Sequence, residues 1–364
     1  MTEFYLIISC LYMCVSAGKG LILGGLFRKA PEESAEHPAI SILIAAKNEE
    51  KKILRLLTSL EKLDYPEEKF EVIVADDNST DSTNQITKEF IKEKKNYLLI
   101  KPGEKAYPAK RGALQACIEK ALYDCFLITD ADCEVERGWL KRMGGGFRKG
   151  ADFIFGPAPF KQTTGSINKI SCYENFRSGL LNLFLLKAGL PFSAPARNFG
   201  FSRKAFEKSG GYGKTLQTLS GDDDLLLREA YRNRLSVHYV PGMESGVKSD
   251  STETLKEYIS QRSRHIKTSF HYLPRHIAAL GVWHLLNLAM VISPVFVFLS
   301  WWCIIPAIIK SGIDVLFSSR FAGEWGYRFS MREAVLLSFS YEFFIVVNFF
   351  SSIFHQPEWK EFRG

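Results

Sequence analysis

Two clusters of carboxylates in this chain of 364 residues have the composition of a reactive site. Asp130 and Asp132 come directly after the apolar run 125–129. On a loop that leaves a buried strand, such a pair makes a hard oxygen site, which suits Mg²⁺ or Mn²⁺ bound together with a substrate diphosphate. The second cluster is the acidic run 222–224. Successive like charges repel one another, which can raise the pKa of one carboxyl toward neutrality, as a general base requires.

Each cluster also has a simpler interpretation. Acidic pairs are common on solvated loops, and a run of aspartates can cap the helix expected at 225–232, which suits Asp224 in particular. The order of the charged segments along the chain, rather than either cluster alone, favours the chemical interpretation.

Alternating strands and helices must position these groups. Strands are expected at 40–46, 70–75, 97–100 and 125–129, and helices at 53–63, 108–123 and 225–232. Strand and helix in repeated succession predict an α/β fold with a parallel sheet and right-handed crossovers. Ligands of such sheets gather at the carboxyl ends of the strands, where the charged residues of this chain also fall.

Three stretches are apolar enough to enter a membrane: 4–27, 277–309 and 334–354. The first predicts an anchor helix with a cytoplasmic C-terminal end, because Arg28 and Lys29 follow it. An interfacial helix is the alternative, given Lys19. The second stretch is either one long tilted span or two short helices broken near Pro294. If each stretch crosses once, the central region and the C-terminus share the cytoplasmic side.

Overall composition narrows the class of protein. The net charge of +7 and the pI near 8.9 do not indicate nucleic acid, since basic and acidic residues alternate and no RNA-binding motif is present. A basic face against an anionic membrane is the simpler account. The seven cysteines are scattered and odd in number, which predicts reduced thiols in the cytosol. We therefore expect an integral protein of the plasma or inner membrane with a cytoplasmic catalytic domain.

The ordered motifs of the chain resemble a known family. These motifs are 41–49, 76–81, 110–114, 130–132, 221–225 and 261–265. Together they resemble the family-2 nucleotide-sugar glycosyltransferases with the GT-A fold, and the flanking apolar stretches are similar to the membrane-bound branch of lipid glycosyltransferases and polysaccharide synthases. The resemblance implies a mixed, mainly parallel sheet flanked by helices, with transmembrane helices at both ends.

The resemblance also implies a division into domains. The expected parts are an anchor helix at 1–29, a cytosolic GT-A domain at 38–270, a transmembrane region at 277–354 and a cytosolic tail at 355–364. Within the GT-A domain, 38–135 forms the nucleotide-binding half and 150–270 the acceptor half. The segment 176–192 is either an interfacial helix or a buried core helix.

Donor-binding residues follow from the resemblance, position by position. The nucleotide is assigned to Ala45, Lys47, Asn48, Glu49, Asp76, Asp77, Lys110 and Asp130. A carboxylate at a strand end can accept the imide N–H of uracil, and Lys110 offers a cation to phosphate. Asp130 and Asp132 would hold Mg²⁺ or Mn²⁺ between the diphosphate oxygens. Without the family, a capping turn and a solvated lysine are the alternatives.

The catalytic base is expected in the second cluster. Alignment on Leu225 and Arg228 favours Asp222 as the group that deprotonates the acceptor hydroxyl, with Asp223 as runner-up. Attack from the face opposite the diphosphate would invert the anomeric carbon. The family usually has Glu-Asp here, whereas this chain has Gly-Asp, so the assignment stays open between the two aspartates.

Acceptor and diphosphate contacts are expected from two further segments. Gln261, Arg264 and His265 match the family's Gln-x-x-Arg-Trp element, in which Arg264 would contact the diphosphate. His265 stands where tryptophan is typical, which argues against a processive synthase and allows an acceptor that bears phosphate. Attraction to lipid headgroups is the simpler role for this basic stretch. Arg197 and Asn198 are the expected acceptor-site residues of the second segment.

These expectations combine into one predicted function. The chain would be an inverting, metal-dependent glycosyltransferase that moves a sugar from a nucleotide-sugar, most simply a UDP-sugar, to a lipid or lipid-linked acceptor. A processive polysaccharide synthase is the enzymatic alternative. A catalytically inactive assembly subunit with the same fold is the alternative outside enzymes, and the intact set of charged residues argues against it.

Overall fold

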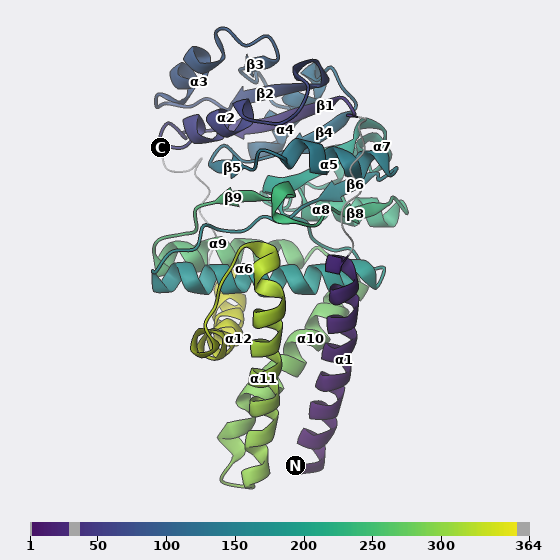
Figure 1. Ribbon diagram of the computed structural model, residues 1–364, viewed down its shortest axis with the longest axis vertical. Helices are drawn as coiled ribbons and strands as arrows, with labels where there is room; N and C mark the ends of the chain where they lie inside the picture. Colours follow the sequence, from purple (N-terminus) through teal and green to yellow (C-terminus); the bar gives the residue numbers. More distant parts are fainter. Residues whose placement is uncertain (1, 29–36, 355–364) are drawn as a thin grey trace. The chain divides into compact units, whose positions relative to one another are not determined.

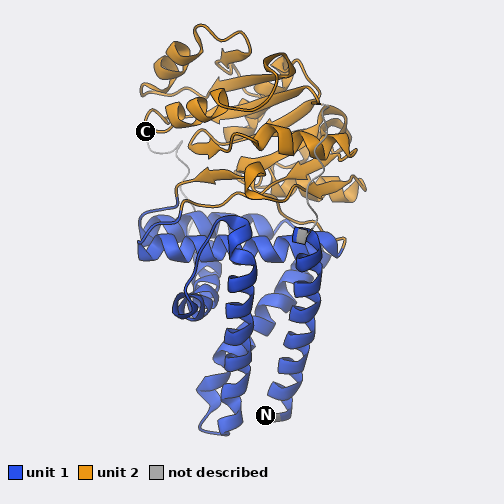
Figure 2. Cartoon of the chain, viewed as in Figure 1, with its two compact units in different colours: residues 1–29, 162–188, 251–358 blue, residues 30–161, 189–250, 359–364 orange. Residues whose placement is uncertain are grey.

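The computed structural model describes residues 2–28 and 37–354, and the chain divides into two compact units (Figure 2). The helical unit contains residues 1–29, 162–188 and 251–358. The sheet unit contains residues 30–161, 189–250 and 359–364. Residues 162–188 and 251–270, which we expected in the central domain, therefore group with the terminal helices. The predicted tail 355–364 lies outside the described residues.

A seven-stranded sheet forms the centre of the sheet unit (Figure 1). Its strands lie in the order β3-β2-β1-β4-β7-β6-β8. Their bounds are β1 Ile40–Ala46, β2 Phe70–Asp76, β3 Tyr97–Ile100, β4 Cys125–Ile128, β6 Phe153–Phe155, β7 Phe199–Ser202 and β8 Val237–Tyr239. β7 runs antiparallel to β4 and β6, while β1 pairs in parallel with both β2 and β4. The predicted mixed, mainly parallel sheet is confirmed.

The helices of the sheet unit bury apolar faces against these strands. In α2, the spacing of Ile53, Leu56, Leu57 and Leu60 puts all four on one buried face, as a helix with a period of 3.6 residues requires. The core that they join includes residues of β1 and β2. The helices of this unit are α2 Ile53–Glu61, α3 Thr83–Ile91, α4 Ala109–Lys120, α5 Trp139–Arg148, α7 Arg203–Lys208 and α8 Asp224–Arg232.

A second, two-stranded sheet continues the chain after the first carboxylate pair. It is made by β5 (Cys133–Val135) and β9 (Val247–Ser249), which pair antiparallel. Two ion pairs flank this ribbon, Lys161 with Glu134 and Lys248 with Glu136, each at 2.6 Å. The ribbon therefore fixes the strand on which the loop of Asp130 and Asp132 ends.

Among its described residues, the helical unit contains six long helices. They are α1 Thr2–Arg28, α6 Ser166–Lys187, α9 Leu255–Ser269, α10 Pro274–Ile292, α11 Ile305–Phe321 and α12 Met331–Phe354. α1 packs against α10 and α11, and α12 packs against α9 and α11. One face of α6, which carries Phe176, Leu180 and Leu183, is buried.

Four helical segments of the described chain are long and apolar enough to cross a membrane: Glu3–Phe27, Pro274–Phe296, Trp301–Trp325 and Met331–Phe354. The apolar stretch that we placed at 277–309 is thus broken after Ile292, close to Pro294, and its second helix continues to Phe321. Pro294 lies in the first turn of the short 3-10 helix Ser293–Phe296, and Pro306 lies in the first turn of α11. Proline at this position is compatible with a new helix start. The presence of apolar helices at both ends of the chain is confirmed.

Candidate active site

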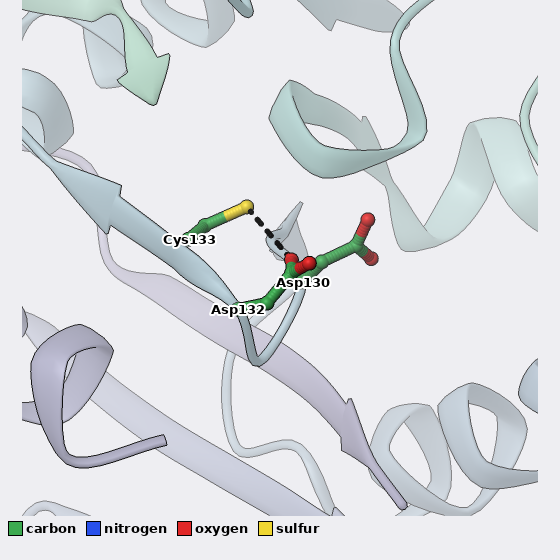
Figure 3. Close-up of side chains that lie close together, drawn as sticks. All are labelled: Asp130, Asp132 and Cys133. Atoms are coloured by element: carbon green, nitrogen blue, oxygen red, sulfur yellow. Dashed lines mark hydrogen bonds between the residues drawn. The ribbon is translucent and has the colours of Figure 1, made fainter. Parts of the chain in front are cut away.

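The first carboxylate pair lies on the loop between β4 and β5 (Figure 3). Asp130, Asp132 and Cys133 each offer one ligand atom, and these atoms lie within 4.8 Å of one another. The Cys133 thiol donates to Asp132 Oδ1 at 3.6 Å. Burial, with Asp130 and Asp132 nearby, raises the pKa of Cys133 well above its ordinary value, so the thiol stays neutral. The two carboxylates are therefore the donors that fit a hard cation such as Mg²⁺ or Mn²⁺.

Two basic residues of the α2 region hold this loop. Lys52 Nζ lies 3.8 Å from Asp132 Oδ2. Arg55 donates through Nη2 to the backbone oxygen of Asp132 at 2.6 Å and to the carboxylate of Asp250 at 2.9 Å. Arg55 thus fixes the backbone of Asp132, and Lys52 lies beside its carboxylate.

Lys110 joins the first carboxylate pair to the second cluster. It belongs to the first turn of α4, and its Nζ lies 2.5 Å from Asp130 and 3.4 Å from Asp222. Burial opposes a charge on this amine, but Asp130 and Asp222 outweigh burial and raise the pKa of Lys110 well above its ordinary value. Lys110 is therefore a permanent cation between two carboxylates that lie far apart in the sequence.

The aspartates of the second cluster differ in their surroundings. Burial opposes ionisation of Asp222, but Lys110 and Arg111 outweigh it, so the pKa of Asp222 is lowered. Burial, with Asp224 and Asp222 beside it, raises the pKa of Asp223 well above its usual value. Asp223 also caps α8 by accepting from the backbone N–H of Asp224 at 2.7 Å. The pKa of Asp222 is thus held low and that of Asp223 high, so Asp222 is the more readily ionised of the two.

The expected nucleoside residues lie at the carboxyl ends of β1 and β2, which are neighbouring parallel strands. Ala45 is the half-buried residue of the otherwise buried β1, and Lys47, Asn48 and Glu49 follow the strand on a loop. Asn48 adopts a left-handed φ of 54°, which asparagine tolerates better than most residues. Its side-chain oxygen accepts from Thr80 N at 2.8 Å. The two loops therefore interlock.

Within these loops Glu49 and Asp76 are held by local hydrogen bonds. The backbone N–H of Glu49 donates to Thr83 Oγ1 at 2.7 Å. Asp76 accepts from Ser79 N at 3.1 Å and from Asn84 Nδ2 at 2.6 Å, and its side chain is buried. The carboxylate of Asp76 thus orders the loop after β2.

Asp77 has a partner that the sequence did not reveal. Lys105 Nζ lies 2.8 and 2.9 Å from the two carboxylate oxygens of Asp77. The loop that carries Lys105 folds closely over Gly112, where an added Cβ would lie 2.2 Å from the backbone oxygen of Tyr107. Only glycine permits this approach, so the motif at 110–114 serves to seat that loop as well as to supply Lys110.

The two residues expected at the acceptor end have different environments. Asn198 is completely buried: its side-chain oxygen accepts from Trp139 Nε1 at 2.9 Å, and its amide donates to the backbone oxygens of Pro157 and Ser245, each at 2.8 Å. These contacts give Asn198 a structural role and leave its amide no direct access to a substrate. Arg197 is half-buried, with its guanidinium 4.6 Å from the centre of the Phe160 ring.

The residues of the Gln-x-x-Arg element lie on α9, in the helical unit. Gln261 and Arg264 are half-buried, and His265 is exposed. Their neighbour Arg262 forms an ion pair at 3.0 Å with Glu174 of α6. Arg262 thus links α9 to α6. The role of Arg264 at a diphosphate stays a prediction.

A groove of about 880 Å³ lies beside α2 and β5, apart from the carboxylates that carry the chemistry. Its lining includes Lys51, Leu54, Arg55 and Glu134, but neither Asp130 nor Asp222. It is therefore not a candidate reaction site.

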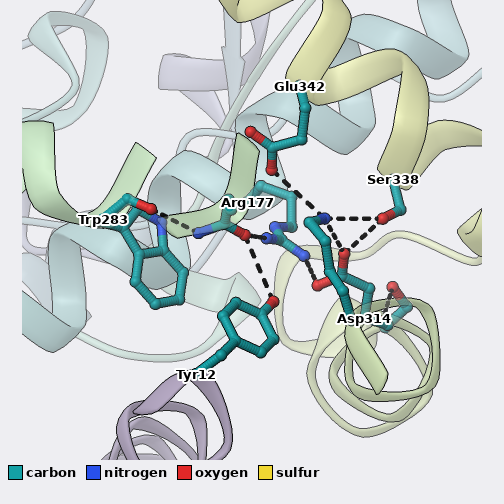
Figure 4. A network of polar contacts seen from close by, with 9 residues as sticks. Tyr12, Arg177, Trp283, Asp314, Ser338 and Glu342 are labelled. Carbon is teal, nitrogen blue, oxygen red and sulfur yellow. Dashed lines mark hydrogen bonds and ion pairs between the residues drawn. The ribbon is translucent and has the colours of Figure 1, made fainter. Parts of the chain in front are cut away.

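A separate cluster of buried charges, away from both carboxylate clusters in the sequence, lies inside the helical unit (Figure 4). Arg177 of α6 pairs with Asp314 of α11, and Lys310 Nζ lies 2.6 Å from the same carboxylate and 3.4 Å from Glu342. Ser338 of α12 donates to Asp314 at 2.5 Å. All five side chains are buried. Since this cluster links three helices through hydrogen-bonded charges, it is suited to fixing how they pack.

Comparisons with known proteins identify the family and the fold of the chain. Residues 41–210 match the model of glycosyl transferase family 2, and residues 127–313 match the model of glycosyl transferase family group 2. A solved structure, the mannosyltransferase PcManGT from Pyrobaculum calidifontis in complex with GDP-Man and Mn²⁺, is similar with a TM-score of 0.59. It is 15% identical, and the match covers 96% of this chain and 99% of that one. This likeness supports the GT-A fold.

Two curated relatives are similar over part of their length. Beta-monoglucosyldiacylglycerol synthase from Nostoc sp. is 39% identical over 103 residues, which are 28% of this chain and 22% of that protein. The probable glycosyltransferase YdaM from Bacillus subtilis is 26% identical over 283 residues, which are 72% of this chain and 65% of that protein. The matched region thus spans less than two thirds of either relative.

Proposed function

The chain belongs to glycosyltransferase family 2, and from this premise we propose that it transfers a single sugar from a nucleotide-sugar to a lipid or lipid-linked acceptor. The observation that carries the proposal is the position of Lys110, whose amine contacts both Asp130 and Asp222. Asp130 belongs to the diphosphate end of the reaction, and Asp222 to the acceptor end. Their shared contact supports a single site in which both ends meet.

The donor is a UDP-sugar. At the end of β2, Asp77 and Lys105 present a carboxylate beside an ammonium. A carboxylate can accept the imide N–H of uracil, and an ammonium can donate to the adjacent carbonyl oxygen. Guanine offers a comparable edge, and the similar protein from Pyrobaculum calidifontis was solved with GDP-Man, so a guanine nucleotide is the competing outcome.

Transfer proceeds by direct displacement with inversion. Asp222, which is ionised, takes the proton of the acceptor hydroxyl. The hydroxyl oxygen bonds to the anomeric carbon as the bond from that carbon to the diphosphate oxygen breaks, and the bonding pair leaves on the diphosphate. Lys110 stabilises the negative charge that grows there. Asp223 is the alternative base: its raised pKa suits a general base, but its carboxylate caps α8 by accepting from the backbone N–H of Asp224.

Asp130 and Asp132 are the residues that would hold Mg²⁺ or Mn²⁺. When bound, such a cation supplies Lewis-acid stabilisation to the departing nucleotide. Lys52 and Arg55 keep the loop in place for that role.

Two observations support a lipid acceptor at the membrane. Four helices of the residues that the structure describes are apolar enough to span a bilayer, and the Nostoc relative is named for a glycolipid product. Arg28, at the end of the first apolar helix, favours a cytoplasmic side for the sheet unit under the positive-inside rule.

The test is transfer by purified full-length protein. Detergent-solubilised protein is incubated with Mn²⁺, diacylglycerol or a polyprenyl phosphate, and UDP-glucose, UDP-GlcNAc, UDP-galactose or GDP-mannose in turn. We expect release of nucleotide that depends on the lipid and on Asp222, and a lipid product heavier by one sugar.

Three outcomes contradict the proposal in different ways. Products with many sugars indicate a processive synthase. Transfer to a soluble sugar but to no lipid rejects the acceptor class. Binding without turnover for every donor and acceptor favours an assembly subunit.

A further inference from the structure

A buried arginine next to the site lysine holds the loop that leads to Asp222. Arg111 follows Lys110 in the first turn of α4 and is 1% exposed. Its Nη1 donates to the backbone oxygen of Thr218 and its Nη2 to that of Ser220, both at 2.6 Å. A guanidinium is a rigid fork, so two such bonds fix the distance and direction of both carbonyls at once.

The chain turns sharply between Ser220 and Asp222. Gly221 has a φ of 83°, in the left-handed region that favours glycine. Its backbone oxygen accepts from Leu225 N at 3.1 Å, which ties the turn to the start of α8. The turn explains why this chain has glycine where the resemblance leads one to expect glutamate: any side chain would be strained here.

The loop before the turn has little apolar packing of its own. Leu216 and Leu219 are 47% and 42% exposed. At the other end of this loop, Arg228 Nη2 donates to the backbone oxygen of Lys214 at 3.0 Å. The segment 214–220 therefore receives hydrogen bonds from two arginines, and Arg111 makes the ones adjacent to the base.

We propose that Arg111 is a positioning residue, which holds the 218–221 backbone so that the carboxylate of Asp222 faces Lys110 and the acceptor hydroxyl. This inference rests on the proposed role of Asp222 and extends it. Arg111 itself does not touch substrate. It links the helix that serves the diphosphate to the loop that carries the base, so loss of the fork should misplace Asp222 without removing any donor contact.

The test compares Arg111, in the first turn of α4, with Arg203, which begins α7 and contacts the backbone at the C-terminal end of α4. Arg111→Met removes the fork, and Arg111→Lys restores one donor. The matched control is Arg203→Met, because Arg203 likewise donates to backbone oxygens, those of Ile118, Ala121 and Tyr123, at 3.0–3.3 Å. All variants are made in the full chain and purified in detergent.

We expect Arg111→Met to lower kcat by about 10- to 100-fold, the usual effect of a small misplacement of a catalytic group. The KM for the nucleotide-sugar and the Mn²⁺-dependent thermal shift with UDP should stay unchanged. Arg111→Lys should recover part of kcat, and Arg203→Met should keep it. Unchanged kcat in Arg111→Met, or equal losses in kcat and donor affinity, would overturn the proposal.

A second measurement covers the case in which a variant is unstable or the wild type shows no transfer. Hydrogen exchange of the 215–222 amides should rise in Arg111→Met and not in Arg203→Met. Gly221→Ala keeps Arg111 but strains the turn, and it should lower kcat with the loop still protected. Equal exchange in wild type and Arg111→Met rejects the holding role, whatever the reaction proves to be.

Discussion

Lys110 Nζ lies 3.4 Å from a carboxylate oxygen of Asp222, although the two residues come from different halves of the sheet unit's sequence. The same amine contacts Asp130, so the two acidic clusters face a common cation. Separate surfaces for the clusters would have ruled out sugar transfer by this chain. Because the clusters meet at Lys110, individual properties of Asp222 can be tested with separate variants.

Replacement of the proposed base should remove turnover and leave donor binding. Asp222→Asn keeps the shape of the side chain but cannot take a proton at neutral pH. We expect kcat to fall by roughly two to four orders of magnitude, the contribution usual for general base catalysis. Steady-state nucleotide release measures kcat, and titration calorimetry with UDP measures binding.

Glu67→Gln is the matched control, because Glu67 is an exposed carboxylate on another loop of the sheet unit. It should behave as wild type. Wild-type turnover in Asp222→Asn, together with its loss in Asp223→Asn, would transfer the role to Asp223.

Loss of one metal ligand should uncouple nucleotide binding from the cation. In Asp132→Ala we expect Mn²⁺ to add nothing to the thermal stabilisation by UDP, whereas in wild type saturating UDP with Mn²⁺ should raise the melting point on the order of 5 °C by mass action. Asp64→Ala, which removes an exposed aspartate, should keep the full shift. A normal Mn²⁺ effect in Asp132→Ala would refute the assignment of the metal site.

The lysine between the clusters should set the acid limit of activity. Lys110 lowers the pKa of Asp222, so in wild type the base stays ionised as pH falls and is lost only below its lowered pKa. Lys110→Met removes the larger of the two cationic contributions and leaves Arg111 as the main group that opposes burial, so the pKa of Asp222 should rise. The acid limb of kcat/KM should therefore move to higher pH, besides any loss of overall rate.

The profile is measured between about pH 4 and pH 9, a range that spans the ordinary carboxyl and imidazole values. Lys105→Met serves as control, since that amine pairs with Asp77 rather than Asp222. An acid limb at the wild-type position in Lys110→Met would show that Asp222 does not limit the rate.

The sequence predicted the elements whose signal is local. The bounds of β1 and β3 agree with the structure. β1 is an apolar run that ends in a polar loop, and it is buried between two parallel neighbours, whereas β3 is a partly exposed edge strand. Asp76, Asp77 and Asp130 were identifiable because they stand at the carboxyl ends of strands. Lys105 and Arg111 were not, since their roles depend on which distant backbone or carboxylate they reach, and a lysine or arginine in a helix or loop carries no signal of its partner.

The helical unit shows a different limit of prediction from sequence. The apolar stretch expected at 277–309 ends directly before Lys310 and close to Asp314, and isolated charges are costly in a bilayer. In the structure these charges neutralise each other inside the unit, so the helix continues to Phe321. Pairing that compensates a buried charge cannot be recognised from hydropathy alone.

Removal of the shared carboxylate in that unit should destabilise it strongly. Asp314→Asn leaves the cations of Arg177 and Lys310 buried without their main counter-charge. An uncompensated buried charge costs about 3–5 kcal/mol. The melting temperature in detergent, followed by tryptophan fluorescence, should fall by several degrees. Ser319→Ala, at an exposed position of the same helix, should have no effect.

A double variant separates lost charge balance from lost packing. Lys310→Met combined with Asp314→Asn removes one charge of each sign and should recover part of the stability lost in Asp314→Asn alone, since fewer cations remain unpaired. If the double variant is less stable than either single variant, the hydrogen bonds that Ser338 and Lys310 donate to Asp314 contribute more to stability than the balance of charges does. If Asp314→Asn melts as wild type does, the cluster does not hold these helices together.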